Sequence, residues 1–427
     1  MNALVGCDNY FGKKEKPPLP GERISILIHQ QFLQPDLNIT NKEILLPRPT
    51  PNDEWPQAGG YPNHAMHHIQ INSDINEIWS ANIGSGTDDD NWLISQPILA
   101  GGMLFTMDSD SEISAFDADN GKRIWKTNVA PKYEEESHIG GGLAYAAGKL
   151  YITTGFSQVI SIDAQTGKVL WQKALEAPFR IAPTVHAGRL YVITIANKLY
   201  ALNSSTGETI WTHSGIEEST NFLGGANPAV DSGVVVAAFS SGEVAALKVE
   251  NGMELWRDSL AARGEPTSAS SIGTIRGRPI IDRGIVFVVS NNDQLVAINL
   301  RTGRRIWDRN IGSIETPWVA GNFVFVLSNS SELVALSRQT GKIYWVTPLW
   351  KWKNIREKSG LIGWTGPVLA SDRLIVANTL GEVLSVSPYS GQVLGQINLS
   401  DGVSISPIVA RGTIYFLSED AELIAYR

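Results

Sequence analysis

The chain has 427 residues, of which 43% are hydrophobic and 18% are charged, and its formal net charge is −8. These apolar residues can bury a large core, so the chain is not disordered in bulk. The acidic balance argues against a nucleic-acid binder, which needs a basic surface to displace counterions from phosphates. No run reaches the roughly 18 apolar residues that span a bilayer. Forty glycines and the low charged fraction favour a turn-rich all-β protein.

The chain begins with a segment that ends in Leu4-Val5-Gly6-Cys7 and resembles the lipobox of a bacterial lipoprotein signal peptide. Cys7 is then the lipidation site, and residues 1–7 are the remnant of a signal peptide that starts upstream. As the only cysteine, Cys7 also excludes an intrachain disulfide. The alternative is a chance cysteine in a cytosolic protein. Asp8 follows, and an aspartate there can retain a lipoprotein in the inner membrane.

Residues 8–74 are predicted to be an N-terminal tether and extension. Residues 8–23 are polar and proline-rich, as expected of a tether between a lipid anchor and a folded domain. The only histidine cluster, His64, His67 and His68, lies in this extension, and imidazoles close in sequence can bind a metal. No acidic or thiol residue adjoins them, so a solvent-exposed or packing role is favoured.

From residue 115 onward one phrase recurs seven times, and each copy reads as a strand, a tight turn and a second strand. Residues before the turn alternate apolar and polar, and an X-Gly pair then supplies the positive φ that a hairpin needs. The copies are A-F-D-A-D-N-G-K-R-I-W (115–125), S-I-D-A-Q-T-G-K-V-L-W (161–171), A-L-N-S-S-T-G-E-T-I-W (201–211), A-L-K-V-E-N-G-M-E-L-W (246–256), A-I-N-L-R-T-G-R-R-I-W (297–307), A-L-S-R-Q-T-G-K-I-Y-W (335–345) and S-V-S-P-Y-S-G-Q-V-L-G (385–395).

Two further short strands precede each phrase, so each repeat predicts one four-stranded propeller blade. The innermost strands begin near Pro97, Leu143, Pro183, Pro228, Pro279, Pro317, Pro367 and Pro407, which makes eight blades. The eighth repeat lacks its last strand, and residues 75–83 can supply it. The sequence therefore predicts an eight-bladed β-propeller over residues 75–427 whose ring is closed by an N-terminal strand, which hides sheet edges.

Seven tryptophans take equivalent places at the ends of the outer strands, where a buried indole can join one blade to the next. Gly395 stands at the eighth such place and predicts a weaker junction. These structural docking residues are Trp79, Trp125, Trp171, Trp211, Trp256, Trp307 and Trp345.

Three other segments invite a functional interpretation. The acidic runs Asp88-Asp89-Asp90 and Asp108-Ser109-Asp110-Ser111-Glu112 could bind a cation, but both fall at predicted turns, where Asp and Ser are ordinary. The basic aromatic run W-K-W-K-N-I-R-E-K (350–358) could contact a partner or a membrane surface. A long inter-blade loop that packs its tryptophans is the favoured interpretation.

The phrase A-x-D-x-x-T-G-x-x-x-W resembles the tryptophan-docking motif of pyrroloquinoline-quinone-type propellers, from about residue 75 to the C-terminus. With the lipobox, the length and the blade order, the closer resemblance is to the BamB family of lipoproteins in the outer-membrane β-barrel assembly machinery. That resemblance implies a non-enzymatic scaffold without a cofactor on the periplasmic face of the outer membrane. It also implies docking on the POTRA domains of a BamA-like subunit, beside other assembly subunits.

In that family, partner contacts cluster in the loops that lead into the fourth and fifth blades. The corresponding loops are 220–228 and 271–279, so the resemblance assigns partner binding to Phe222, Leu223, Thr274, Ile275 and Arg276. The basic residue expected after Leu223 is replaced by Gly224. Thr274 and Arg276 stand where the best-known members carry acids, so the contact chemistry differs.

Two other functions remain open at this point. A quinoprotein dehydrogenase shares the repeat, but such enzymes stack their quinone against adjacent cysteines and hold calcium with carboxylate and amide oxygens. A propeller ectodomain of a sensor that binds unfolded chains is the third possibility. The lack of a transmembrane segment or a kinase domain in this sequence counts against it.

Overall fold

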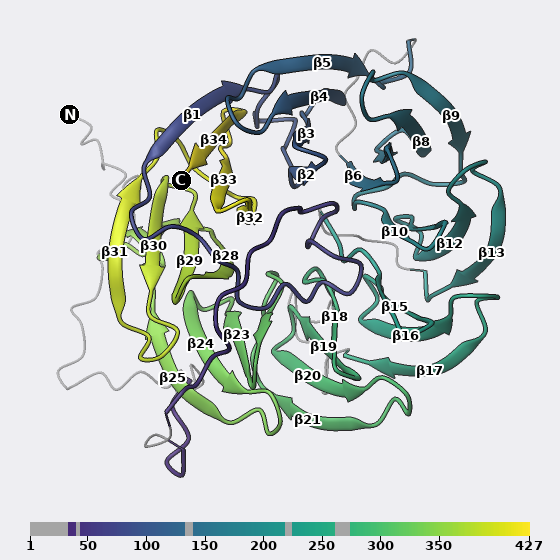
Figure 1. Cartoon of the computed structure of the whole chain (residues 1–427). Helices are drawn as coiled ribbons and strands as arrows, with labels where there is room; N and C mark the ends of the chain where they lie inside the picture. Colours follow the sequence, from purple (N-terminus) through teal and green to yellow (C-terminus); the bar gives the residue numbers. More distant parts are fainter. Residues whose placement is uncertain (1–32, 40–42, 133–139, 218–223, 261–273) are drawn as a thin grey trace, which may run out of the picture. The chain divides into compact units, whose positions relative to one another are not determined.

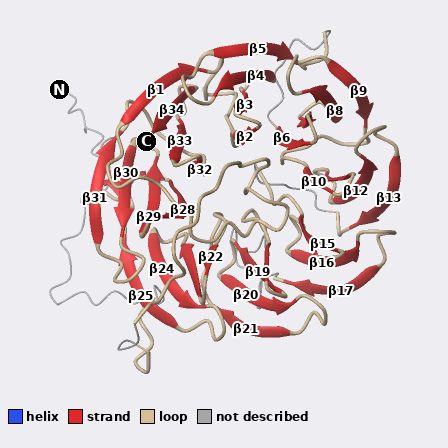
Figure 2. Cartoon of the chain, in the orientation of Figure 1, coloured by secondary structure: helices blue, strands red, loops and turns tan. Residues whose placement is uncertain are grey.

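The computed structural model of the protein describes residues 33–39, 43–132, 140–217, 224–260 and 274–427. Residues Pro35–Arg427 form one compact unit, to which the description below refers. The described residues are strands, turns and loops, as Figure 2 shows. No helix among them is long and apolar enough to cross a membrane.

Eight four-stranded antiparallel sheets are arranged as blades around a central axis, as Figure 1 shows, which confirms the predicted eight-bladed propeller. Written from the innermost to the outermost strand, blades 1 to 4 are β2 (Ile98–Ala100), β3 (Met103–Met107), β4 (Glu112–Asp117), β5 (Arg123–Asn128); β6 (Gly141–Ala146), β7 (Lys149–Thr154), β8 (Gln158–Asp163), β9 (Val169–Ala174); β10 (Thr184–His186), β11 (Arg189–Ile193), β12 (Lys198–Asn203), β13 (Thr209–Ser214); and β14 (Ala229–Asp231), β15 (Val234–Ala238), β16 (Glu243–Lys248), β17 (Glu254–Ser259).

The second half of the ring repeats this order, with one extra hairpin between blades 6 and 7. Blades 5 to 8 are β18 (Ile280–Asp282), β19 (Ile285–Ser290), β20 (Gln294–Asn299), β21 (Arg305–Arg309); β22 (Trp318–Ala320), β23 (Phe323–Leu327), β24 (Glu332–Ser337), β25 (Ile343–Pro348); β28 (Trp364–Ala370), β29 (Arg373–Asn378), β30 (Glu382–Val386), β31 (Val393–Asn398); and β32 (Ile408–Ala410), β33 (Thr413–Leu417), β34 (Glu422–Tyr426), β1 (Glu77–Asn82). The hairpin consists of β26 (Trp352–Asn354) and β27 (Ser359–Leu361).

The turn between the two outer strands explains the polar residue and the glycine of each phrase. In blade 2, Asp163 Oδ1 accepts hydrogen bonds from the backbone of Gln165 and Thr166, while Gly167 N donates to Asp163 O. Gly167 has φ +68°, and a β-bulge follows Ser161. A short Asp or Asn side chain and a left-handed glycine thus close the hairpin.

The ring is closed by strands from the two ends of the chain, as predicted. The N-terminal strand β1 pairs antiparallel with β34, with Trp79 opposite Ala425. Arg427 N donates to Asn76 O at 2.9 Å and Asn76 N to Arg427 O at 3.2 Å, which extends the pairing. Because blade 8 takes its two outer strands from opposite ends of the chain, no turn glycine joins them.

The seven repeat tryptophans couple each blade to the following one. Each indole Nε1 donates to a backbone carbonyl of the next blade, from 2.7 Å for Trp256 to Leu300 up to 3.3 Å for Trp79 to Ala118. Each ring also lies against the turn glycine of that blade. A Cβ placed on the glycine would come within 2.5 to 2.8 Å of the Trp side chain, so only glycine fits. The pairs are Trp79–Gly121, Trp125–Gly167, Trp171–Gly207, Trp211–Gly252, Trp256–Gly303, Trp307–Gly341 and Trp345–Gly391.

Residues 50–71, which we call the insert, run through the centre of the ring beside the innermost strands (Figure 1). Backbone groups on the inner edge of a propeller blade have no neighbouring strand, and the insert accepts hydrogen bonds from one or more of them in seven blades and from the indole of Trp318 in blade 6. From blade 1 to blade 8 the bonds are Leu99 N to Trp55 O, Tyr145 N to Pro56 O, Val185 N to Gln57 Oε1, Val230 N to Pro62 O, Ile281 N to Asn63 O, Trp318 Nε1 to His67 O, Ser371 N to Ile69 O and Arg411 N to Asn52 O.

His64 fastens the insert to blades 4 and 5. Its Nδ1 lies 2.7 Å from Pro279 O, so this nitrogen carries the proton, and its Nε2 accepts from Asn227 Nδ2 at 3.0 Å. Burial lowers the pKa of His64 to about 3. The hydrogen bond to the Pro279 carbonyl opposes this shift in part, and the positive charge of Arg278 adds a smaller lowering of the pKa. The imidazole is therefore neutral and serves as a structural link.

Substitutions of glycine in blade 3 should separate the indole contact from backbone strain. Gly207 has φ +74° and lies against Trp171, whereas Gly188 has φ +76° and would place a Cβ in open space. We expect G188A to lower the free energy of unfolding by about 1–2 kcal/mol because alanine disfavours this conformation. G207A should lower the free energy of unfolding by about 1–3 kcal/mol more than G188A does, because the methyl group also displaces the indole. Urea unfolding measures both, and equal losses would contradict the assigned contact.

His64 should make the protein sensitive to mild acid. In the unfolded chain its pKa is near 6.5 and in the fold about 3, so below pH 6.5 the unfolded state binds more protons and stability falls with pH. From pH 7 to pH 5 this group alone should remove about 2 kcal/mol. H64N is the control because asparagine tolerates the left-handed backbone found there, at φ 59°. Its unfolding free energy should change less over the same interval, and an identical pH slope would refute the assignment.

Candidate functional site at the channel mouth

Polar side chains gather at one end of the central channel, in a depression of about 180 Å³. Most of them lie in loops that run from the outer strand of one blade to the innermost strand of the next and so converge on the axis, while Thr365 lies on the innermost strand of blade 7, β28. Ala58 of the insert is also part of its lining. We call this site the channel mouth and define it by Arg180, Asn227, Arg276, Arg278, Glu315 and Thr365.

Arg278 is held rigidly in this site. Its Nε donates to Asn227 Oδ1 at 2.7 Å and its Nη1 to Thr316 Oγ1 at 3.4 Å. Asn227 Nδ2 in turn donates to Ala58 O at 3.2 Å, so the insert positions the arginine. Burial lowers the pKa of Arg278 to about 10, which still leaves the guanidinium charged at neutral pH.

Glu315 is the one carboxylate among the residues that define the mouth. Its Oε2 accepts from Thr365 Oγ1 at 2.9 Å and from Gly366 N at 3.2 Å. Burial raises the pKa of Glu315, while these hydrogen bonds and the charges of Arg276 and Arg278 act in the opposite direction. With three arginines against one glutamate, the channel mouth has a positive excess in a chain whose net charge is −8.

The two loops assigned to partner binding meet at this site. The guanidinium of Arg276 lies so close to Gly224 that a Cβ there would stand 3.1 Å from Arg276 Nη2, and Gly224 has φ +86°. Glycine at position 224 therefore leaves room for the arginine. Phe222 and Leu223 lie outside the described residues, as do Cys7 and Asp8.

Burial corrects the assignment of two residues to the contact surface. Thr274 is 2% exposed and Ile275 is 1% exposed, and Ile275 packs in the hydrophobic cluster between blades 4 and 5. Their side chains cannot reach a partner in this conformation. Arg276, which is half-buried at the mouth, is the described residue of the five that can.

The acidic runs form turns. Asp88 Oδ1 accepts from the backbone of Asp90 and Asn91, and Asp108 Oδ1 accepts from the backbone of Asp110 and Glu112. These bonds are typical of Asp in turns. In the described part of the chain no three His, Cys, Asp or Glu side chains are grouped so that they could hold a metal.

The histidine cluster is divided among separate contacts with the propeller. His68 Nδ1 faces Pro47 O at 2.7 Å and its Nε2 accepts from Asp372 N at 2.9 Å, while His64 binds blades 4 and 5. His67 has a half-exposed side chain, 3.7 Å from Asp282. The packing role holds for the two buried imidazoles. Sequence reasoning missed that their segment is the insert, and the signal that could have found it is an apolar residue, Trp55, amid polar neighbours.

The basic aromatic run also differs from its prediction. Residues 352–361 form the hairpin of β26 and β27, and Trp350 before it is 62% exposed. The expectation of a loop that packs its tryptophans is therefore wrong for Trp350. The next indole along the chain that is buried is Trp364, whose Nε1 donates to Trp350 O at 2.7 Å.

Comparison with known proteins places the chain among assembly factors. A family model described as "Outer membrane protein assembly factor BamB" matches residues 109–347, more than half of the chain. Proteins of that name from Escherichia coli (strain K12) and Shigella dysenteriae are each 26% identical over 203 residues, which are 47% of this chain and 50% of the relative. The one from Aliivibrio fischeri is 31% identical over 201 residues, again 47% and 50%. The chain thus spans about half the length of the curated relatives it matches.

Solved structures share the fold. BamB from Moraxella catarrhalis aligns with a TM-score of 0.70 and 20% identity, covering 83% of this chain and all of that chain. The quinohemoprotein alcohol dehydrogenase from Comamonas testosteroni aligns with a TM-score of 0.67 and 13% identity, covering 87% and 80%. Identities this low establish the propeller alone. Since the family model covers six of the seven phrases in full, from the first turn of blade 1 to the outer strand of blade 6, the chain belongs to the family of the outer membrane protein assembly factor BamB.

Proposed function

We propose that this protein is a non-catalytic, lipid-anchored periplasmic scaffold that docks on the barrel-assembly subunit and assists the folding and insertion of outer-membrane β-barrel proteins. Membership of the assembly-factor family supports the process. The channel mouth supports the docking role, because its arginines project from loops on a rigid ring and can bind a partner without a costly rearrangement. The positive excess at the mouth is the observation that carries the proposal.

The partner surface proposed here comprises the channel mouth with Arg276, together with Phe222 and Leu223, which precede Gly224 in the sequence. In this proposal the arginines bind acidic groups of the POTRA domains of a BamA-like subunit, and the two apolar side chains contribute buried area. Complementary charge of this kind raises the rate of association and selects the partner. Other assembly subunits join through that subunit, and Cys7 holds the complex to the membrane.

A quinone dehydrogenase fits the residues less well. Calcium requires several carboxylate or amide oxygens, and at the channel mouth the carboxylate of Glu315 already accepts two hydrogen bonds beside Arg276 and Arg278. The insert also fills the channel beside this site, with Gln57 bound to blade 3 and Ala58 to Asn227. These residues do not fit a quinone with its calcium ion, so we derive no catalytic step.

Reversal of charge at the mouth should weaken partner docking. R276E should weaken association with the purified POTRA domains by about tenfold or more, since it places a negative charge opposite acidic groups. R301E is the matched control, because Arg301 is an exposed turn residue on the adjoining fifth blade, outside the channel mouth. Surface plasmon resonance with immobilised POTRA domains measures both. The docking surface is wrong if F222S/L223S/R276E binds as tightly as the unaltered protein.

Lipidation at Cys7 should determine membrane attachment. In the full-length precursor, C7S should move the protein from the membrane fraction to the soluble periplasm, because the fold itself offers no anchor in this proposal. Fractionation followed by immunoblotting gives the distribution. D8S is the companion variant, and it reports through density-gradient separation whether Asp8 retains the protein in the inner membrane. A C7S protein that stays in the membrane fraction would rule out the lipid anchor.

A further inference from the structure

The junction between blades 7 and 8 contains an apolar pocket of about 380 Å³ in the place where the other seven junctions hold an indole. In blade 1, Trp125 pairs with Ala115, which pairs with Phe105. In blade 7, Gly395 pairs with Ser385, which pairs with Ile375. Gly395, Ser385 and Ile375 all line the pocket. On the blade 7 side, the pocket is therefore the place that an indole takes in the other repeats.

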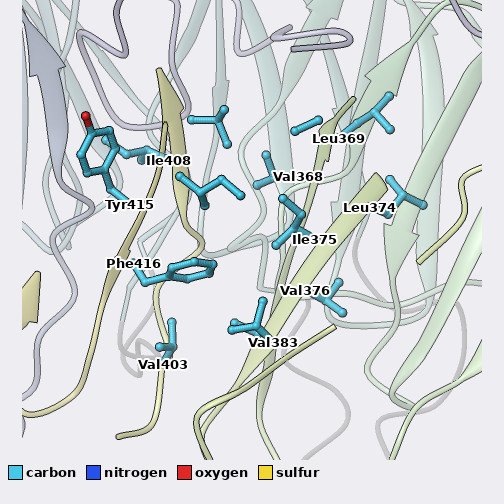
Figure 3. Packing of buried hydrophobic residues seen from close by; sticks show 14 of the residues in the cluster. Val368, Leu369, Leu374, Ile375, Val376, Val383, Val403, Ile408, Tyr415 and Phe416 are labelled. Atoms are coloured by element: carbon cyan, nitrogen blue, oxygen red, sulfur yellow. The ribbon is translucent and has the colours of Figure 1, made fainter. Parts of the chain in front are cut away.

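The opposite wall of the pocket comes from blade 8. Ile414, Phe416 and Tyr426 line it on that side. Figure 3 shows Phe416 on β33 facing blade 7, where Ile375 lies on β29 and Val383 on β30. Phe416 and Ile375 are each 1% exposed, so the base of the pocket is a firm apolar surface.

Gly395 leaves this space open to the surface. A Cβ added at Gly395 would meet no heavy atom within 4 Å, and its backbone is not left-handed. Every residue of β31 is exposed, including Leu394 at 57% and Ile397 at 36%, both of which line the pocket. Ser385 and Gln396 add oxygen atoms that can accept a hydrogen bond from an indole N–H.

We propose that this pocket, which we call the blade 7–8 pocket, binds a tryptophan side chain of a partner polypeptide. The sister junctions specify the ring, because the strand register found in blade 7 places an indole here in the other repeats; the turn glycine that each of those indoles meets is missing from blade 8. The exposed Leu394 and Ile397 specify a polypeptide, because they extend the apolar contact beyond one ring to the neighbours of the inserted residue. This site is independent of the channel mouth and does not rest on the function proposed for it.

To test this, a short fluorescein-labelled peptide with one central tryptophan is titrated with the full chain. Fluorescence anisotropy measures the binding. The same peptide with alanine in place of tryptophan should bind about tenfold more weakly, because it loses the buried ring. G395W fills the pocket with the chain's own indole and should weaken the binding of the tryptophan peptide by about tenfold or more. G395L fills part of it and should weaken binding as well, which keeps the test valid if G395W does not fold.

V393W is the matched control. Val393 is exposed on the same strand and is absent from the pocket lining, so an indole there leaves the pocket open. We expect V393W to bind the peptide like the unaltered protein. The proposal is overturned if the peptide does not bind, if G395W and G395L bind normally, or if V393W loses as much affinity. Binding of N-acetyltryptophanamide without binding of the peptide would overturn the assignment to a polypeptide.

Discussion

The packing of each indole against a glycine of the following blade is the interaction on which the ring depends. It needs two residues at once, a tryptophan at the outer strand of one blade and a left-handed glycine in the hairpin turn of the next. A side chain at the glycine would enter the ring, and a smaller residue in place of the tryptophan would leave the carbonyl of the next blade without its Nε1 donor. Because both members come from the same repeated phrase, one local motif builds the hairpin and joins it to its neighbour.

The same constraint accounts for the break in the pattern. Blade 8 obtains its outer strands from both ends of the chain, so it has no hairpin turn and no turn glycine for a tryptophan of blade 7 to meet. Blade 7 has Gly395 in the place where the outer strands of the other blades have a tryptophan. Ring closure by β1 and the absence of an indole between blades 7 and 8 are therefore two results of one topology. The hydrogen bonds between Arg427 and Asn76 close the ring within blade 8, and no indole of the described residues joins blade 7 to blade 8.

The repeat made the propeller predictable because its information is local. A strand, an X-Gly turn and, in six of the seven copies, a tryptophan lie within eleven residues, and the eight innermost strands that start near Pro97, Leu143 and their counterparts give the number of blades. The insert has no such signal. It binds through backbone atoms and single side chains across long separations, as when Asn52 Nδ2 donates to Val409 O 357 residues away. Ile275 shows a related limit, since a resemblance places it in a contact loop while its apolar side chain belongs to the core that the loop covers.

The insert also determines where the charged groups of the channel mouth lie. Each innermost strand exposes one edge to the axis. The insert is hydrogen-bonded to backbone N–H groups of seven blades and to the Trp318 indole of blade 6, and it occupies the channel beside the mouth. The charge of Arg278 is then held at the mouth through Asn227, whose amide the insert binds at Ala58 and His64. Protein walls around these guanidinium groups keep them less screened than surface arginines. A segment outside the repeats thus gives an otherwise symmetric ring one charged, preorganised end.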